Sequence, residues 1–214
     1  MRLIASYRNA GFKALADGAV AFFDRRSDLQ RRGVAFGGES SGNAGEGQGP
    51  AKVSTDISLV AIDRSDPEAF ALAEVIMRGV GAALERYLQE RPLLRECCPG
   101  QALFVNPIFN LQRYAPGEGF HRWHCDWNTS EEGTEPIRRV LAWILYCNDV
   151  SEGGTEFHWQ EHHEEAVRGK LLIFPAGLSH IHRGRVSHGQ TKTIATGWIN
   201  AGTLADYLER LAAS

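Results

Sequence analysis

Apolar and polar positions follow a helical period in the first hundred residues of this 214-residue chain. Apolar side chains recur at helix-compatible spacing over about 9–30 and again over about 66–89. Asp66, Pro67 and Glu68 are typical of a helix start, because aspartate caps free N–H groups and proline suits the first turn. Pro92 follows, and we expect the second helix to end before it.

Beyond residue 103 the pattern changes to short runs rich in β-branched and aromatic residues, punctuated by Gly, Pro, Asn and Asp. Many short strands with regular turns predict a sandwich or barrel, and helices placed before strands favour a mainly β, α+β fold. A further strand is expected from residue 52 and a short helix over 203–213. The seven predicted strands are 103–113, 120–125, 139–146, 155–159, 170–174, 183–186 and 191–200.

The predicted elements amount to a single domain over 1–214. Its parts are a helical support region over 1–100, a β core over 103–200 and the closing helix. One stretch, 37–50, is polar and glycine-rich, and it cannot bury much apolar surface. Two interpretations of it stay open, a mobile surface loop or a lid that orders over substrate.

Composition excludes several classes of protein. A hydrophobic content of 43% and a charged content of 23% are ordinary globular values, and the net charge of −3 indicates neither a nucleic-acid nor a membrane partner. No apolar run approaches the roughly 20 residues of a membrane span. Polar residues interrupt the N-terminus too early for a signal peptide. Four cysteines without a C-x-x-C pattern indicate reduced thiols, and we expect a cytoplasmic protein.

His124-Cys125-Asp126 carries the clearest chemical signal. On an extended segment, His124 and Asp126 point to the same side, because strand side chains alternate. One imidazole and one carboxylate lack only a second histidine to form the 2-His-1-carboxylate triad of non-haem Fe(II) oxygenases. His180 or His182, which share the same parity, can supply it, and His188 lies close by.

A buried cation is also predicted. On the strand over 191–200, alternation places Lys192 on one face with Ile194, Thr196 and Trp198. A lysine on such a face suits a sequestered carboxylate, while the alternative is a lysine that extends from a strand edge to solvent. Arg122, Trp123, Trp127 and Trp143 are candidates for groups near the site.

Six ordered motifs between about 111 and 200 resemble the Fe(II)/2-oxoglutarate-dependent dioxygenase superfamily, and within it the prolyl 4-hydroxylase-like branch. The motif Tyr-Leu-Asn of that branch is altered here to Tyr-Cys-Asn, and about six extra residues lie within 128–136. The matching residues are Tyr114 with Pro116-Gly117, His124-x-Asp126, Arg139 with Tyr146-Cys147-Asn148, Gly153-Gly154-Thr155-Glu156-Phe157, Gly169-x-Leu171-x-x-Phe174, and the distal histidine with Lys192 and Trp198.

The resemblance implies a double-stranded β-helix (jelly-roll) core that uses Fe(II), 2-oxoglutarate and O2, with ascorbate open as an additional cofactor. His124, Asp126 and His182 would bind iron, and the ten-residue interval to Lys192 favours His182 over His180. Lys192 would pair with the distal carboxylate of 2-oxoglutarate. Tyr114 and Tyr146 match positions whose hydroxyls contact this co-substrate, although core packing is the alternative for both.

The implied reaction is hydroxylation of an unactivated C–H bond with release of succinate and CO2. Branch resemblance favours a prolyl residue in a peptide or protein, while free amino acids and small metabolites stay open. The competing hypotheses are a cupin-type metalloenzyme or a metal-binding sensor that does not use 2-oxoglutarate. His158, His162 and His163 fit an exposed hairpin end better than a second metal site. Oligomeric state is left open.

Overall fold

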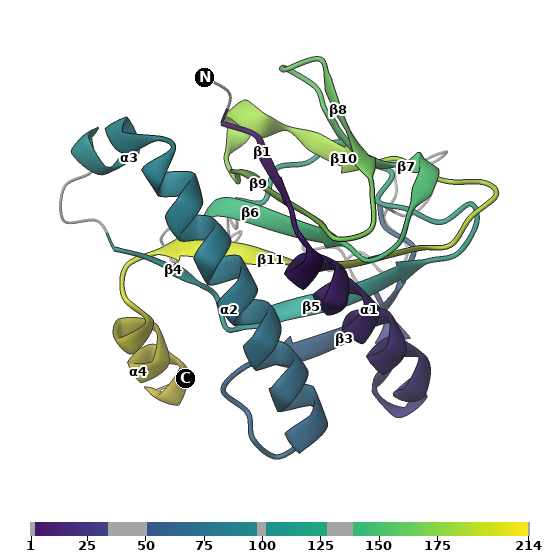
Figure 1. The fold of residues 1–214 in the computed structure, drawn as a ribbon, viewed down its shortest axis with the longest axis horizontal. Coiled ribbons are helices and arrows are strands. Elements are labelled where there is room, and N and C mark those ends of the chain that lie inside the picture. Colours follow the sequence, from purple (N-terminus) through teal and green to yellow (C-terminus); the bar gives the residue numbers. More distant parts are fainter. Residues whose placement is uncertain (1–2, 34–50, 98–101, 128–138, 214) are drawn as a thin grey trace.

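The computed structural model describes residues 3–33, 51–97, 102–127 and 139–213. The 37–50 stretch and the 128–136 insertion lie outside these residues. Within the described chain, two antiparallel sheets face each other, and the long helices lie across the outer face of the larger sheet (Figure 1). This is the mainly β, jelly-roll arrangement with flanking helices that the sequence predicts.

The larger sheet has eight strands in the order β1-β9-β6-β11-β5-β3-β2, with β4 also paired to β11. The smaller sheet has three in the order β10-β7-β8. The larger sheet consists of β1 (Ala5–Arg8), β2 (Arg31–Arg32), β3 (Thr55–Val60), β4 (Leu103–Val105), β5 (Ile108–Tyr114), β6 (Arg139–Tyr146), β9 (Lys170–Pro175) and β11 (Lys192–Ala201). The smaller sheet consists of β7 (Val150–Phe157), β8 (His162–Ala166) and β10 (His182–Gly184).

The helices are α1 (Ala10–Arg25), α2 (Pro67–Gln89), the short α3 (Pro92–Cys97) and α4 (Leu204–Ala213). The Asp66 carboxylate accepts hydrogen bonds from the N–H groups of Glu68 and Ala69, as the predicted cap requires. The helix ends at Gln89. Pro92 lies beyond the end of α2, and it is also the first residue of α3. At that position the missing N–H of proline loses no helix hydrogen bond.

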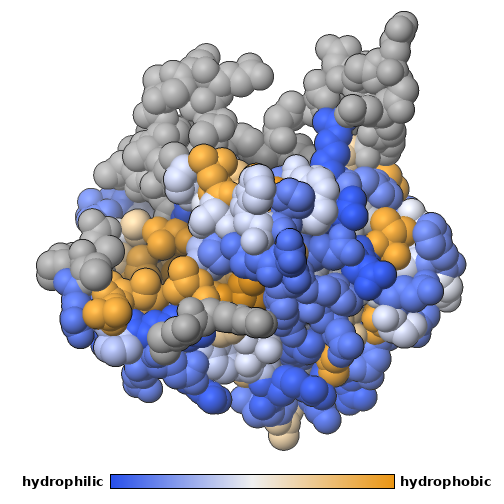
Figure 2. Space-filling model, turned by 90° about the horizontal axis from the view of Figure 1, so that it is seen from above, coloured by the Kyte–Doolittle hydropathy of each residue, from blue (hydrophilic) through white to orange (hydrophobic). Residues whose placement is uncertain are grey.

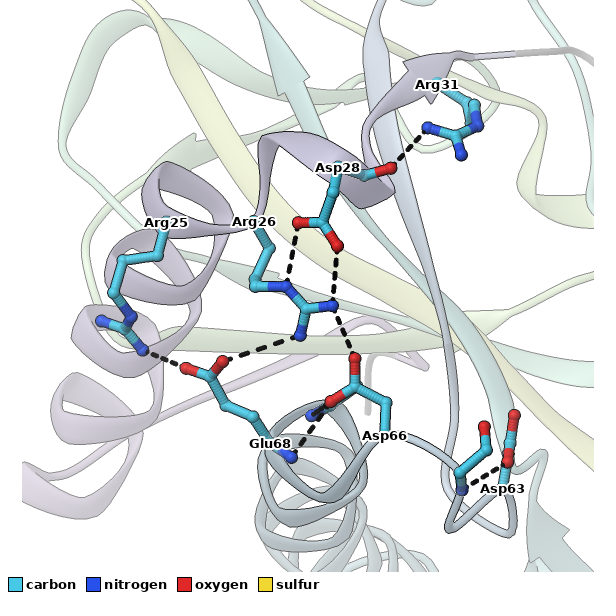
Figure 3. Close-up of polar contacts among 9 residues, drawn as sticks. Arg25, Arg26, Asp28, Arg31, Asp63, Asp66 and Glu68 are labelled. Carbon is cyan, nitrogen blue, oxygen red and sulfur yellow. Dashed lines mark hydrogen bonds and ion pairs between the residues drawn. The ribbon is translucent and has the colours of Figure 1, made fainter.

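Ion pairs join the end of α1 to the start of α2 (Figure 3). The Arg26 guanidinium lies 2.9 Å from Asp28 Oδ2 and 2.6 Å from Asp66 Oδ2, and Arg25 lies 2.6 Å from Glu68 Oε1. The hydrogen bond from Arg26 is the main cause that lowers the pKa of Asp66 to about 2. These contacts fix how the two helices meet above the sheet.

Alternation along the strands of the larger sheet separates two hydrophobic cores. Ala195 and Ile199 of β11 belong to the core under the helices, whereas Ile194 belongs to the core between the two sheets. The first core also contains Phe22, Ile76 and Trp143. The second is lined by Tyr114, Tyr146, Phe157, Leu172 and Phe174. Groups at even-numbered positions of β11 therefore face the space between the sheets.

The expected strand over 120–125 is wrong, because the structure has only isolated bridges there. Lys52 pairs with Phe120, and His124 pairs with His182. The backbone hydrogen bonds of this segment go to three separate partners, Ala51, His182 and Ala176, so no continuous ladder forms. In contrast, β1 and β8 were not expected from the sequence. No helix among the described residues is long and apolar enough to cross a membrane.

Two motif glycines provide a matched test of backbone conformation. Gly117 and Gly154 both have positive φ, +86° and +107°. A Cβ at Gly117 would meet nothing within 4 Å, but one at Gly154 would meet the Glu164 backbone. We expect Gly117→Ala to lower the free energy of unfolding by about 1–2 kcal/mol and Gly154→Ala to lower it by clearly more. Urea unfolding measures both, and equal losses would contradict the steric argument.

Candidate active site

Three side chains from two segments converge between the sheets. The ligand atoms of His124, Asp126 and His182 all lie within 4.8 Å of one another. His182 Nε2 lies 3.5 Å from Asp126 Oδ2. His182 opens β10, and reciprocal backbone hydrogen bonds of 3.0 and 2.8 Å hold His124 opposite it. A single ion placed between these atoms can contact all three.

Both imidazoles are held in the form that a metal ligand needs. The Nδ1 atom of His124 lies 3.1 Å from the Arg122 carbonyl, and that of His182 lies 2.9 Å from the His180 carbonyl. Because a carbonyl only accepts, each neutral ring carries its hydrogen on Nδ1, which leaves the Nε2 lone pair for a metal. Burial, and then the charge of His182, lowers the pKa of His124 to about 4, so this ring is neutral at pH 7.

Aromatic side chains fix the orientation of the two rings. Phe120 stacks on His124 with ring centres 3.7 Å apart, and Phe174 meets His182 edge-on at 4.8 Å. Two imidazole nitrogens and one carboxylate oxygen on one side of a point are the donor set of non-haem Fe(II) sites. The described residues therefore fit Fe(II) with one face left for other ligands.

His180 lies apart from this cluster. It ends a short 3₁₀ helix (Leu178–His180), and its Nδ1 lies 3.0 Å from Ser179 Oγ. Among the described residues, His124, Asp126 and His182 are the one group whose spacing could hold a metal. His158 is exposed and His162 and His163 are half-buried in the β7–β8 hairpin, so they form no second cluster in that part of the chain.

Lys192 is buried between the sheets, with 4% of its surface exposed. Its Nζ donates to the Arg185 carbonyl at 2.7 Å and lies 5.0 Å from the centre of the Tyr114 ring. Burial lowers the pKa of Lys192 to about 8. No carboxylate of the described residues forms an ion pair with it. Burying such an ammonium group costs several kcal/mol unless an anion compensates it.

The other two buried lysines behave differently. Lys52 Nζ lies 2.6 Å from Asp56 Oδ2, and Lys170 Nζ lies 2.6 Å from Glu164 Oε1. Ser54 also donates to Asp56, at 2.7 Å. Each of these charges is balanced within the protein. Lys192 is therefore the buried lysine, among those described, that is left for a ligand.

The two predicted tyrosines face the same space and have internal partners. Tyr114 donates to Gln112 Oε1 at 2.6 Å, and the Tyr146 hydroxyl lies 2.7 Å from Thr155 Oγ1. Burial raises the pKa of both hydroxyls, so each keeps its hydrogen at neutral pH. Both face the space between the sheets as protonated hydroxyls, which can donate to an anion.

Several neighbours of the site were missed from the sequence. Phe120, Gln112 and the Lys52–Asp56 pair all contact or adjoin the predicted residues. A signal for the pair existed, because residues 52, 54 and 56 are polar at period 2 and so share one face of an extended segment. Phe120 and Gln112 carry no such signal.

The tryptophans that we expected near the site lie in different environments. Trp143 is fully buried in the core under the helices, where it packs on Phe109, so its expected place near the site is wrong. Trp123 and Trp127 are partly exposed, and Arg183 stacks on Trp123 at 4.3 Å.

Elsewhere, hydrophobic side chains gather on the left of the face shown in Figure 2, while much of that face is hydrophilic.

Comparison with known proteins agrees with this geometry. The family model of the 2OG-Fe(II) oxygenase superfamily matches residues 109–200, which contain the three clustered side chains and Lys192. None of the curated proteins compared with the chain matches it.

Three solved structures that are similar to this chain over most of its length are named as prolyl hydroxylases. The viral collagen prolyl hydroxylase from Paramecium Bursaria Chlorella virus-1 has a TM-score of 0.61 at 14% identity, covering 94% of this chain and 97% of its own. A Pseudomonas putida prolyl-4-hydroxylase has a TM-score of 0.59 at 16% identity, with 92% and 91% covered. A Trichoplax adhaerens prolyl hydroxylase has 0.59 at 12%, with 99% and 87% covered.

The predicted resemblance is confirmed by the family match, while the solved structures add a common fold along most of the chain. Residues 109–200 thus match the 2OG-Fe(II) oxygenase superfamily and hold the His-Asp-His triad, which identifies an enzyme that uses Fe(II), 2-oxoglutarate and O2.

Proposed function

We propose that this enzyme hydroxylates an unactivated C–H bond of a prolyl residue in a peptide or protein. His124, Asp126 and His182 hold the iron in this proposal. Lys192 pairs with the distal carboxylate of 2-oxoglutarate, and the hydroxyls of Tyr114 and Tyr146 contact the same co-substrate. Succinate and CO2 are the co-products.

The observation that carries the proposal is the charge left uncompensated between the sheets. Fe(II) would bring two positive charges and Lys192 brings a third, while Asp126 offers one negative charge. The pairs Lys52–Asp56 and Lys170–Glu164 cancel internally. A dianion that spans the metal and Lys192 balances this group of charges, and 2-oxoglutarate has a carboxylate at each end.

The protein's own part is to orient and to exclude water. The rings of His124 and His182 present Nε2, because each Nδ1 faces a backbone carbonyl, and Asp126 adds a carboxylate donor. Lys192 fixes the far end of the co-substrate as a point charge within an apolar surrounding. When bound, Fe(II) would supply the activation of O2, which is the oxidant: one of its oxygen atoms enters the C–H bond and the other enters succinate, as 2-oxoglutarate loses CO2.

Two further observations support the finer parts of the proposal. Three similar structures are named as prolyl hydroxylases, and the one from Trichoplax adhaerens is in complex with a hypoxia inducible factor peptide fragment. These names motivate a prolyl peptide as the substrate. Cys125 and Cys147 are free thiols, which suits the reducing conditions that preserve Fe(II), and we place the enzyme in the cytoplasm on that ground.

The ligand assignment is tested with four alanine variants. We expect His124→Ala, Asp126→Ala and His182→Ala each to abolish succinate production, because each removes one of three metal donors. His180→Ala is the matched control and should keep at least a third of the activity. Succinate release from 2-oxoglutarate by Fe(II)-loaded protein, with a prolyl peptide panel, is the measurement. A cupin-type enzyme that does not use 2-oxoglutarate would release none even as wild type.

Affinity for 2-oxoglutarate should depend on pH through Lys192. Binding of a dianion favours the protonated ammonium, so affinity is constant below the free pKa of about 8. Above it, affinity should fall by up to about tenfold per pH unit, because Lys192 must then take up a proton to bind. Lys192→Arg stays charged and should lose this fall. A wild-type dissociation constant that is flat between pH 7 and 10 would contradict the assignment.

Removing the cation altogether gives a third test. Lys192→Met should weaken 2-oxoglutarate binding by at least a hundredfold, since a hydrogen-bonded charge pair in a buried site is worth about 3 kcal/mol or more. The same variant should bind Fe(II) or Mn(II) with nearly unchanged affinity. A similar loss of metal binding would indicate a misfolded site instead.

A further inference from the structure

The three groups that are proposed to bind the co-substrate differ in whether they have a hydrogen free to donate. Lys192 has three N–H hydrogens, and the Arg185 carbonyl takes one of them. Tyr146 and Thr155 form a pair of hydroxyls in which one donates to the other, so one hydrogen stays available. Tyr114 has a single hydrogen, and Gln112 Oε1 accepts it. Of the three groups, only Tyr114 must break an existing hydrogen bond before it can donate to a ligand.

This hydrogen bond is short and buried. The distance between Tyr114 Oη and Gln112 Oε1 is 2.6 Å, and both side chains lie between the sheets with less than a tenth of their surface exposed. Because Tyr114 stays protonated, it can reach an anion only as a donor. Water cannot readily replace the lost acceptor at such a site.

Sheet register places this bond beside the lysine. Tyr114 is the cross-strand partner of Lys192, and Gln112 is the partner of Ile194. On its other side, Gln112 is the cross-strand partner of Asp56. A carboxylate that approaches Lys192 therefore arrives next to Tyr114 while Gln112 still holds the hydroxyl hydrogen.

Asp56 also fixes which end of the Gln112 amide faces Tyr114. Directly paired residues on one face of an antiparallel sheet have Cβ atoms about 5 Å apart. The Asp56 carboxylate is an acceptor only, and it already takes hydrogen bonds from Lys52 and Ser54. Turning the amide over would bring the Gln112 oxygen toward this carboxylate, which is repulsive. The oxygen thus stays toward Tyr114.

We propose that Gln112 sets the affinity for 2-oxoglutarate, by holding the only hydroxyl hydrogen of Tyr114 until the co-substrate displaces it. Gln112 is a positioning residue in this account, because it acts through Tyr114. The inference rests on the proposed function, and specifically on Tyr114 as a donor to the distal carboxylate.

The test is Gln112→Met, which keeps the length of the side chain but offers only a weak acceptor. The Tyr114 hydrogen is then free before the ligand arrives. We expect 2-oxoglutarate to bind about threefold to tenfold more tightly, the ratio that corresponds to one ordinary hydrogen bond. Isothermal calorimetry with Mn(II)-loaded protein measures the dissociation constant without turnover. Gln112→Leu is a second variant in case the methionine packs badly.

A double-mutant cycle separates this effect from a general structural change. Tyr114→Phe should weaken binding, and adding Gln112→Met to it should change affinity less than twofold, because no hydroxyl remains to be released. Tyr87→Phe is the matched control. It removes another buried tyrosine hydroxyl, which donates to the Leu3 carbonyl at 2.8 Å on the helix side of the sheet, and it should leave 2-oxoglutarate affinity unchanged.

The outcomes are distinguishable. Unchanged or weaker binding by both Gln112 variants, while wild type binds normally, would overturn the role of Gln112 and leave the proposed function standing. A gain of affinity that persists in the Tyr114→Phe background would overturn it as well, because the gain could not then act through the hydroxyl. Wild-type protein that binds metal but no 2-oxoglutarate would overturn the proposed function itself.

Discussion

The cost of burying charge organises the space between the two sheets. An ion removed from water costs several kcal/mol unless an opposite charge or hydrogen bonds replace the solvent. Lys52 and Lys170 meet this cost with carboxylates from the protein, at 2.6 Å each. Lys192 has the Arg185 carbonyl and the face of the Tyr114 ring. That difference marks the position where the fold leaves room for an anion from outside.

The pairing of β11 with its neighbours places the other residues of the site around the uncompensated charge of Lys192. β11 pairs with β5 on one side and β6 on the other, so Lys192 lies beside Tyr114, and Ile194 lies between Gln112 and Tyr146. The smaller sheet adds Thr155 and His182 from the opposite side. Because the helices cover the far face of the larger sheet, Ala195 and Ile199 of β11 belong to an ordinary apolar core. One strand thus serves stability with one face and chemistry with the other.

The metal cluster depends on a less regular part of the backbone. His124 belongs to a segment without a continuous ladder, held by single backbone bonds to Ala51, His182 and Ala176. Such a segment is free to aim His124 and Asp126 at one point, which a flat strand would space evenly along its length. The Phe120 ring, the Arg122 carbonyl and the paired backbone of His182 then restrict the His124 ring.

The sequence by itself determined the class of fold, the three clustered side chains and the burial of Lys192, because period-2 patterning and ordered short motifs are local properties of the chain. The ten-residue interval to Lys192 also favoured His182 over His180, and the geometry places His182 in the cluster. Only the tertiary structure decided that Trp143 lies under the helices, that 120–125 forms no strand, and that Gln112 and Asp56 adjoin Tyr114. These facts depend on which distant strands pair and in which register, and a one-residue shift in pairing would turn every side chain to the other face.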